Sequence, residues 1–180
     1  YQVHDSLVLE TERLALTAMT APALRAWLEK DADALRTLTG AWFPEPVESP
    51  PLFGKDLPMF LDRMEETPTE LGWWVWLVHR KDSHLVVGVC GLSGRPLDGG
   101  TMLGYSVYPE HEGHGYATEA SKALVAWVLQ QPGAYRVDAT VPIAHSASIS
   151  VAVKLGMSEV GRDSDPKVGE IAAYRLERST

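Results

Sequence analysis

Gly113 and Gly115 are the residues of this sequence that point most directly to chemistry. They lie between an alternating apolar stretch that ends at Val107 and an amphipathic stretch that starts near Ala117, which predicts a tight loop between a strand and a helix. Glycine lets the backbone turn tightly and approach a ligand. The free amides and positive dipole end of the helix would face this loop and bind phosphate. The run therefore predicts a site for a pyrophosphate-bearing molecule, although an ordinary tight turn has the same glycines.

Two other groups of reactive side chains carry weaker signals. The run His111-Glu112-Gly113-His114 lacks the His-Glu-x-x-His spacing and lies in a glycine loop rather than on one helix face, so no metal site is expected. Cys90, the one cysteine of the chain, stands within an apolar run. We expect it to be a small core residue, the alternative being a thiol that carries an acyl group.

Two periodic patterns of apolar residues predict the strands and helices that must position these residues. Alternation predicts strands over residues 7–18, 72–80, 85–92, 101–108, 135–141, 157–162 and 169–177. Helical spacing predicts one or two helices over 22–38, and others over 55–66, 117–130 and 146–155. Six of the twelve prolines lie between Pro44 and Pro68, which predicts an irregular segment with a functional or mobile role. Antiparallel strands followed by strand–helix–strand–helix–strand indicate an α+β fold.

The size and composition fit one domain over residues 7–177. The chain has 180 residues, 45% of them apolar, and a formal net charge of −8. We expect no membrane span and no signal peptide, because no apolar run approaches about 20 residues and no basic stretch precedes one. A single cysteine suits the reducing cytoplasm. The acidic balance argues against nucleic-acid binding and gives slight support to a cationic substrate.

Three segments carry recognisable motifs: LETERL, from Leu9 to Leu14; GYSVYPEHEGHGYATEA, from Gly104 to Ala120; and TVPIAHSASISVAVKLGM, which starts at Thr140. In this order they resemble segments of the GNAT superfamily of N-acetyltransferases. The first looks like the first strand of the branch that contains the ribosomal-protein N-terminal Ala/Ser acetyltransferases. The second is similar to the acetyl-CoA-binding segment, and the third looks like the strand and helix near the CoA thiol. The resemblance implies a mixed, mostly antiparallel, curved sheet, splayed between its fourth and fifth strands and flanked by helices, with CoA in the splay.

By this resemblance acetyl-CoA is the co-substrate. The residues that would bind it are Val107, Tyr108, Glu112, Gly113, His114, Gly115, Tyr116, Ala117, Thr118 and His145. The backbone of Val107 and Tyr108 would hold the pantetheine arm, and an amide near a strand bulge would polarise the thioester carbonyl. His145 would hydrogen-bond the same arm or be a plain turn histidine. Ser148 would protonate the departing thiolate or, alternatively, bond the backbone at the helix start.

Four positions depart from the family pattern. Glu112 stands where an Arg or Gln is usual, Met102 where the strand often carries a Glu, His145 where an Asn is usual, and Ala152 where a Tyr often sits. With Met102 in that place, Tyr105, Glu110 or a chain of waters would take the proton of the amine, or the amine would arrive neutral. The departures keep a second function open, that of a CoA-binding or protein-binding module that has lost catalysis.

Aromatic residues are the candidates for the acceptor side. Trp74 and Trp76 are expected on one face of their strand, and with Trp42 and Phe43 of the Pro-rich segment they would line an acceptor pocket. An exposed aromatic patch would instead suit a homodimer surface. The sequence thus predicts an acetyl-CoA-dependent N-acetyltransferase without a metal. It would acetylate a protein N-terminus or a small amine by direct transfer in a ternary complex.

Overall fold

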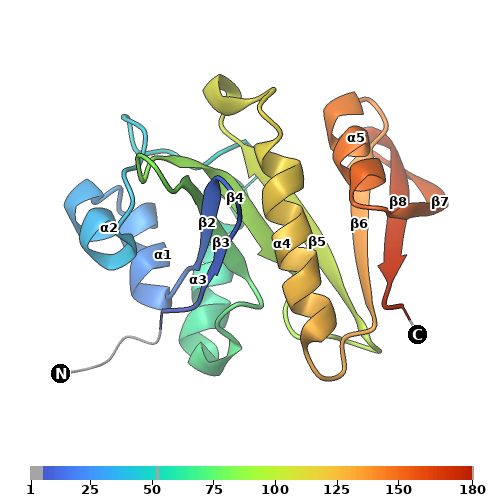
Figure 1. Cartoon of the computed structure of the whole chain (residues 1–180), viewed down its shortest axis with the longest axis horizontal. Helices are drawn as coiled ribbons and strands as arrows, with labels where there is room; N and C mark the ends of the chain where they lie inside the picture. Colours follow the sequence, from blue (N-terminus) through green and yellow to red (C-terminus); the bar gives the residue numbers. More distant parts are fainter. Residues whose placement is uncertain (1–5, 52, 180) are drawn as a thin grey trace.

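Eight strands form a single sheet with helices against both faces (Figure 1). The computed structural model describes residues 6–51 and 53–179. The strands are β1 (Val8–Glu10), β2 (Leu14–Ala18), β3 (Val75–Arg80), β4 (Val86–Leu92), β5 (Gly100–Val107), β6 (Arg136–Pro142), β7 (Ser158–Asp165) and β8 (Gly169–Glu177). The helices are α1 (Ala21–Leu28), α2 (Ala32–Thr39), α3 (Leu57–Glu66), α4 (Tyr116–Gln130) and α5 (Ser146–Lys154). Within the described ranges, no helix is long and apolar enough to span a bilayer.

The strand order confirms the predicted α+β architecture. It runs β1-β2-β3-β4-β5-β6-β8-β7, and the neighbours are antiparallel except for β5 and β6. These two parallel strands pair only from Gly100 to Met102 with Arg136 to Asp138. Beyond Met102 they separate, so the sheet opens beside the end of β5 that leads into the glycine loop.

The number of strands before this opening is one more than predicted. Residues 7–18 form a hairpin of β1 and β2 rather than one strand, so the splay lies between β5 and β6. The turn contains no Gly or Pro. The Thr11 hydroxyl accepts from the Leu14 amide (3.0 Å) and donates to Glu119 of α4 (2.5 Å). Because a contact from α4 stabilises the turn, the local sequence does not reveal it.

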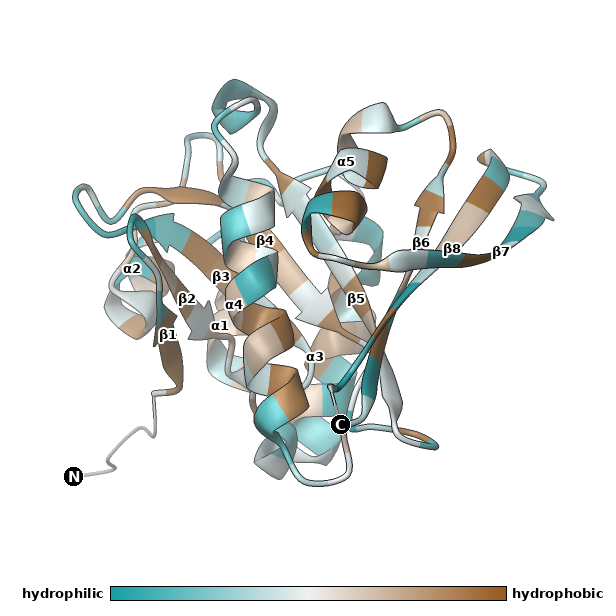
Figure 2. Ribbon diagram, turned by 45° about the vertical axis from the view of Figure 1, so that its right-hand side comes forward, coloured by the Kyte–Doolittle hydropathy of each residue, from teal (hydrophilic) through white to brown (hydrophobic). Residues whose placement is uncertain are grey.

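Helix α4 covers one face of the sheet, and α1 and α3 cover the other. The amphipathic helix predicted over residues 117–130 is confirmed, since Ala120, Leu124 and Val128 of α4 are buried in the first hydrophobic cluster. Figure 2 shows the hydrophobic and hydrophilic residues that this amphipathic helix carries. Trp27 of α1 and Phe60 of α3 belong to a second cluster on the opposite face. The sheet therefore separates two cores, and its opening is accessible between them.

Trp74 and Trp76 lie on opposite faces, and the prediction that they share one is wrong. Strand β3 begins only at Val75, and the chain bends just before it, so the alternation does not extend back to Trp74. Trp76 is fully buried beside Trp127 of α4, with ring centroids 5.4 Å apart. Trp74 lies 6.2 Å from Phe60 of α3 on the other face.

Candidate functional site

The glycine loop leads the chain from β5 into α4, as the sequence predicts. Gly113 and Gly115 have left-handed backbone conformations, with φ of 80° and 78°. Gly115 is the N-cap residue of α4 and has no side chain with which to cap the helix. The first amides of α4 are therefore left for another acceptor, and an anion suits both these donors and the helix dipole.

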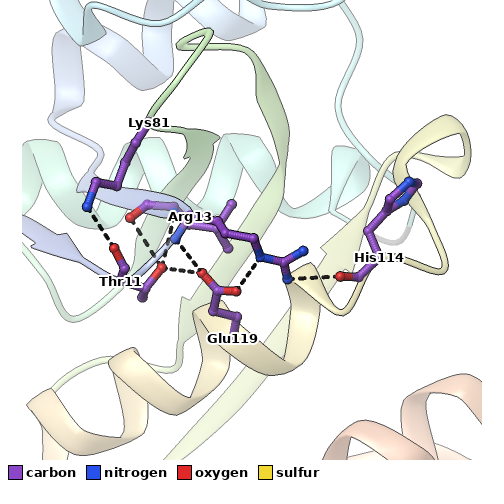
Figure 3. A network of polar contacts seen from close by, with 6 residues as sticks. Thr11, Arg13, Lys81, His114 and Glu119 are labelled. Atoms are coloured by element: carbon purple, nitrogen blue, oxygen red, sulfur yellow. Dashed lines mark hydrogen bonds and ion pairs between the residues drawn. The ribbon is translucent and has the colours of Figure 1, made fainter.

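An arginine from the N-terminal hairpin fixes this loop (Figure 3). Nε of Arg13 donates to Oε1 of Glu119 (2.7 Å), and Nη2 donates to the carbonyl oxygen of His114 (2.9 Å). The guanidinium also lies over the Tyr116 ring, 4.8 Å from its centroid. Burial alone would raise the pKa of the Glu119 carboxyl, but hydrogen bonds from Thr11 and Arg13 lower it overall. Glu119 is thus ionised at neutral pH and bonded to the hairpin.

A cavity of about 680 Å³, called here the donor cavity, lies beside the loop. It is bounded by the end of β5, the glycine loop with the start of α4, and one face of α5. Ten predicted site residues line it: Tyr105, Val107, Glu112, Gly113, Gly115, Tyr116, Ala117, Thr118, His145 and Ser148. Lys154 of α5 adds a cation to this lining. The amides of α4, the glycines and Lys154 together suit a phosphate-bearing ligand.

The open edge of β5 offers backbone amides to the donor cavity. The Tyr108 amide donates to the Val87 carbonyl (3.0 Å), and because donors alternate along a strand, the Val107 amide points toward the gap beside β6. The register of β4 with β5 is regular from Gly88 and Val107 to the end of β4. The bulge predicted here is therefore absent from this pairing, and an amide of the open strand edge is left to polarise a carbonyl.

A second cavity, of about 440 Å³, lies between α3 and the sheet and is called here the acceptor cavity. Phe53, Phe60 and Trp74 form an aromatic part of its lining. Met59 and Met102 also line it, as do two charged residues at the start of α3, Lys55 and Asp56. A volume in this range is typical of a site for a small molecule or one end of a peptide.

Tyr105, His145 and Ser148 line both cavities and so mark their junction. The Tyr105 hydroxyl donates to the carbonyl oxygen of Ser148 (2.7 Å) and holds the first turn of α5 against β5. Burial raises the pKa of Tyr105 to about 12. In this structure Tyr105 acts as a hydrogen-bond donor, and its predicted role as the base stays a prediction.

Two residues predicted to bind the donor do not line its cavity. Tyr108 is buried, and its hydroxyl donates to the carbonyl of Glu48. The His114 ring turns back to the carbonyls of His111 (3.1 Å) and Glu112 (3.0 Å) and stacks on Tyr116. His114 is thus occupied with its own loop, while the exposed Glu112 does lie at the cavity.

Three of the four predicted acceptor aromatics also lie elsewhere. Trp76 is in the core, and Phe43 packs edge-on against Trp27 with ring centroids 5.3 Å apart. Trp42 is 56% exposed beneath the Arg36 guanidinium, 4.3 Å from the ring centroid. Only Trp74 of this group lines the acceptor cavity, because the other side chains are held by partners outside it. A role of Trp42 in a homodimer surface stays a prediction.

The remaining reactive groups lie away from the junction. Cys90 is buried, and burial raises the pKa of its thiol to about 12, which fits the predicted core residue rather than an acyl carrier. Glu110 lines neither cavity. In the part of the chain that the structure describes, no group of three or more His, Cys, Asp or Glu side chains is placed to hold a metal ion.

The sequence analysis missed Lys154 and most of the acceptor cavity. Lys154 follows Ala147 and Val151 at helical spacing, and all three line the donor cavity, so the period of α5 already contained this signal. Phe53 and Phe60 had no such signal. They meet Trp74 only because the Pro-rich segment and α3 fold over the sheet.

Comparisons with known proteins place this geometry in a family context. Residues 13–158 match a family model described as Acetyltransferase (GNAT) domain. YjdG, an uncharacterized N-acetyltransferase of Bacillus subtilis (strain 168), is 28% identical over 155 residues, which cover 83% of this chain and 89% of that protein.

Solved structures with a similar fold include two acetyltransferases of ribosomal proteins. RimL, a ribosomal alpha-N-protein acetyltransferase in complex with Coenzyme A, gives a TM-score of 0.67 at 16% identity, over 95% of this chain and 98% of that chain. A ribosomal-protein alanine acetyltransferase from Vibrio fischeri gives 0.65 at 16% identity, over 95% and 96% of the two chains. These neighbours are of the branch that the sequence resembles.

Proposed function

Because the chain belongs to the GNAT acetyltransferase family, we propose that it moves an acetyl group from acetyl-CoA to a primary amine. The observation that carries this proposal is the meeting of two cavities at Tyr105, His145 and Ser148. One cavity has a phosphate-binding loop and the other does not, so donor and acceptor would approach the junction from opposite sides. Such a ternary complex allows direct transfer, and holding both reactants in place supplies much of the rate.

The residues of the donor cavity suit acetyl-CoA in charge and position. The amides of α4 and the cation of Lys154 would bind phosphate groups, and the free edge of β5 near Val107 would hydrogen-bond the amide-containing arm. Bound acetyl-CoA supplies an activated acetyl thioester at the junction. The exposed carboxylate of Glu112 weakens this attraction only modestly, because water screens an exposed charge.

At the junction, Ser148 and His145 divide the proton transfers. The amine nitrogen bonds to the acetyl carbon, and the bond from that carbon to sulfur breaks. The Ser148 hydroxyl gives its proton to the departing sulfur, and His145 or water accepts the proton that the nitrogen loses and returns it to Ser148. Tyr105 fixes the backbone of Ser148 and so acts as a positioning residue.

The acceptor would be a protein N-terminus or a small primary amine. RimL and the alanine acetyltransferase from Vibrio fischeri act on ribosomal proteins, which favours the first choice. The size of the acceptor cavity is compatible with both, since one terminal residue or one small amine fills a similar volume.

A rival function is a CoA-binding module that has lost catalysis, favoured by Glu112, Met102 and Ala152. The test incubates the purified chain with acetyl-CoA and a set of primary amines and peptides, and measures free thiol together with acetylated product by mass spectrometry. The enzyme releases thiol and forms product in equal amounts. Tight CoA binding with no product above the protein-free rate would establish the rival instead.

A further inference from the structure

The acceptor cavity has an aromatic wall formed by three residues that are distant in sequence. The rings of Phe53 and Phe60 are stacked with centroids 6.0 Å apart, and those of Phe60 and Trp74 are tilted at 6.2 Å. Met59 and Met102 extend the apolar surface and are 40% and 38% exposed. Phe53 and Phe60 are each 8% exposed and belong to the second core cluster, whereas Trp74 is half-buried. The apolar surface that the cavity meets is therefore the small exposed part of the two phenyl rings together with Trp74, Met59 and Met102.

Glycines on and beside the sheet, which have no side chain, make room for the aromatic wall. Gly91 of β4 and Gly104 of β5 are paired across the two strands. A Cβ at Gly91 would lie 3.1 Å from the Phe53 ring, and one at Gly104 would lie 3.6 Å from it. A Cβ at Gly94 would come within 2.9 Å of the Trp74 ring. The sheet is thus shaped to receive these rings, which indicates a built pocket rather than a chance gap.

Hydrogen bonds hold the segments that carry the wall. The Ser106 hydroxyl of β5 donates to the Pro51 carbonyl, and the Tyr108 hydroxyl donates to the Glu48 carbonyl. Nε1 of Trp74 donates to Glu70 (2.8 Å). The first two bonds connect the Pro-rich segment to β5 and to the residue that follows it, and the third holds the Trp74 ring. The wall is therefore formed before any acceptor arrives, and it needs little ordering to bind one.

The charges at this cavity favour an amine over an acid. Asp56, the N-cap residue of α3, is half-buried, whereas Lys55 just before it is exposed. A carboxylate with less solvent around it attracts an approaching ammonium group more strongly than an exposed lysine at a similar distance repels it. The cavity thus combines a half-buried carboxylate with the apolar wall.

From this combination we infer that the acceptor carries its primary amine beside an apolar or aromatic group, which packs on Phe53, Phe60 and Trp74. The inference rests on the proposed acetyl transfer and adds the substrate class. An acceptor with a phenyl or branched aliphatic group gains binding free energy by burying that group against the wall. An acceptor with only polar atoms either leaves the wall in contact with water or loses its own hydration. An N-terminal Phe, Leu or Met, or a phenylalkylamine, has the required form.

The test compares kcat/KM for amines that differ only in this group. With acetyl-CoA saturating, 2-phenylethylamine is expected to be used at least about tenfold better than ethanolamine, and a Phe-Gly-Gly peptide at least about tenfold better than Ser-Gly-Gly or Glu-Gly-Gly. Transfer with equal or reversed preference would overturn the inference and leave the proposed function standing. An absence of transfer to every amine would overturn the proposed function itself.

Two variants locate the preference at the wall. Phe60→Ala and the more exposed Met102→Ser should each lower the ratio of kcat/KM for 2-phenylethylamine to that for ethanolamine about three- to tenfold. This ratio is independent of how much of each preparation is folded. Tyr135→Ala removes an exposed aromatic ring outside both cavities and should leave the ratio unchanged. An unchanged ratio in both wall variants would contradict the assignment.

Discussion

At the scale of single residues, the proposed acetyl transfer at the junction depends on the Ser148 hydroxyl and the His145 imidazole. The structure holds these two residues differently. Ser148 is held through its backbone by Tyr105 (2.7 Å), while its side chain lines both cavities. His145 precedes the first residue of α5 and is exposed. The proposed mechanism gives each a different reactant, and each proposed role has a separate kinetic signature.

Ser148→Ala should lower kcat at least about tenfold, because it would remove the proposed proton donor for the leaving sulfur. The dissociation constant for CoA should stay within about threefold, since the proposed phosphate donors are the amides of α4 and Lys154 rather than this hydroxyl. The kcat is measured in a stopped assay, and the Kd for CoA is measured by calorimetry. The control is Ser150→Ala, which removes another hydroxyl from the same helix. Ser150 lines only the donor cavity, so the kcat of Ser150→Ala should exceed that of Ser148→Ala. Full activity of Ser148→Ala would remove this residue from the mechanism.

His145→Asn restores the residue usual in the family and separates two roles of His145. If the imidazole accepts the amine proton, the variant keeps its CoA affinity but loses about tenfold or more in kcat, because an amide is not a base. If His145 only hydrogen-bonds the pantetheine arm, Asn performs the same contact and kcat is retained. We expect the loss in kcat, since His145 lines the acceptor cavity as well.

At the scale of elements, the proposed phosphate-binding loop depends on the left-handed backbone of Gly115 and on the ion pair of Arg13 with Glu119. Gly115→Ala strains a left-handed residue and adds a methyl group at the loop that lines the donor cavity. The Kd for CoA should rise about three- to tenfold. Gly133→Ala is the matched control, because Gly133 has nearly the same φ (80°), has no atom within 4 Å of an added Cβ, and lies outside both cavities. Both variants lose about 1 kcal/mol of stability, and equal CoA affinity in the two would refute the loop assignment.

The ion pair of Arg13 with Glu119 is expected to matter for CoA binding more than for stability. Arg13→Met keeps much of the volume but removes the donor to the His114 carbonyl, so the loop loosens and Kd for CoA rises about threefold or more. Loss of stability should be only about 0.5–1 kcal/mol, since the Arg13 side chain is 45% exposed. Arg175→Met breaks a comparable pair, with Asp138 at 2.7 Å, outside both cavities. A parallel effect of both variants on Kd would show that lost charge alone, and not the loop, is responsible.

At the scale of the whole molecule, the sequence predicts the features that depend on local patterns and misses those that depend on long-range contacts. The glycine loop, α4 and the splay were predictable because turn residues, the apolar stripe and three family motifs all lie in short stretches. The β1–β2 turn was missed because Glu119 stabilises Thr11 from a distance of 108 residues. The acceptor wall was missed for the same kind of reason, since Phe53 and Trp74 meet only after the Pro-rich segment folds over the glycines of β4 and β5.

The pH dependence of overall stability should be governed near neutrality by His79 of β3. This side chain is 7% exposed, and its Nδ1 has no hydrogen-bond partner in the described residues, while Nε2 lies 3.3 Å from the Thr17 hydroxyl. Burial lowers the pKa of His79, the nearby backbone of Arg80 opposes this shift, and the nearby His84 adds to it. The imidazole is therefore neutral in the folded state over a pH range in which the unfolded chain is protonated.

Because the unfolded state binds the extra proton, the free energy of unfolding should fall as the pH drops below about 6.5 and on toward the lower pKa of folded His79, by at most about 1.4 kcal/mol per pH unit. The carboxyls whose pKa is lowered in the folded state, such as those of Glu119 and Asp82, lose their contribution only below about pH 4.5. Urea unfolding at pH 5, 6, 7 and 8 therefore isolates the histidine. His79→Phe keeps an aromatic ring in the site and should flatten the profile between pH 7 and 5, even if its stability at pH 8 differs from that of the parent. An equal slope in parent and variant would assign the acid sensitivity to another group.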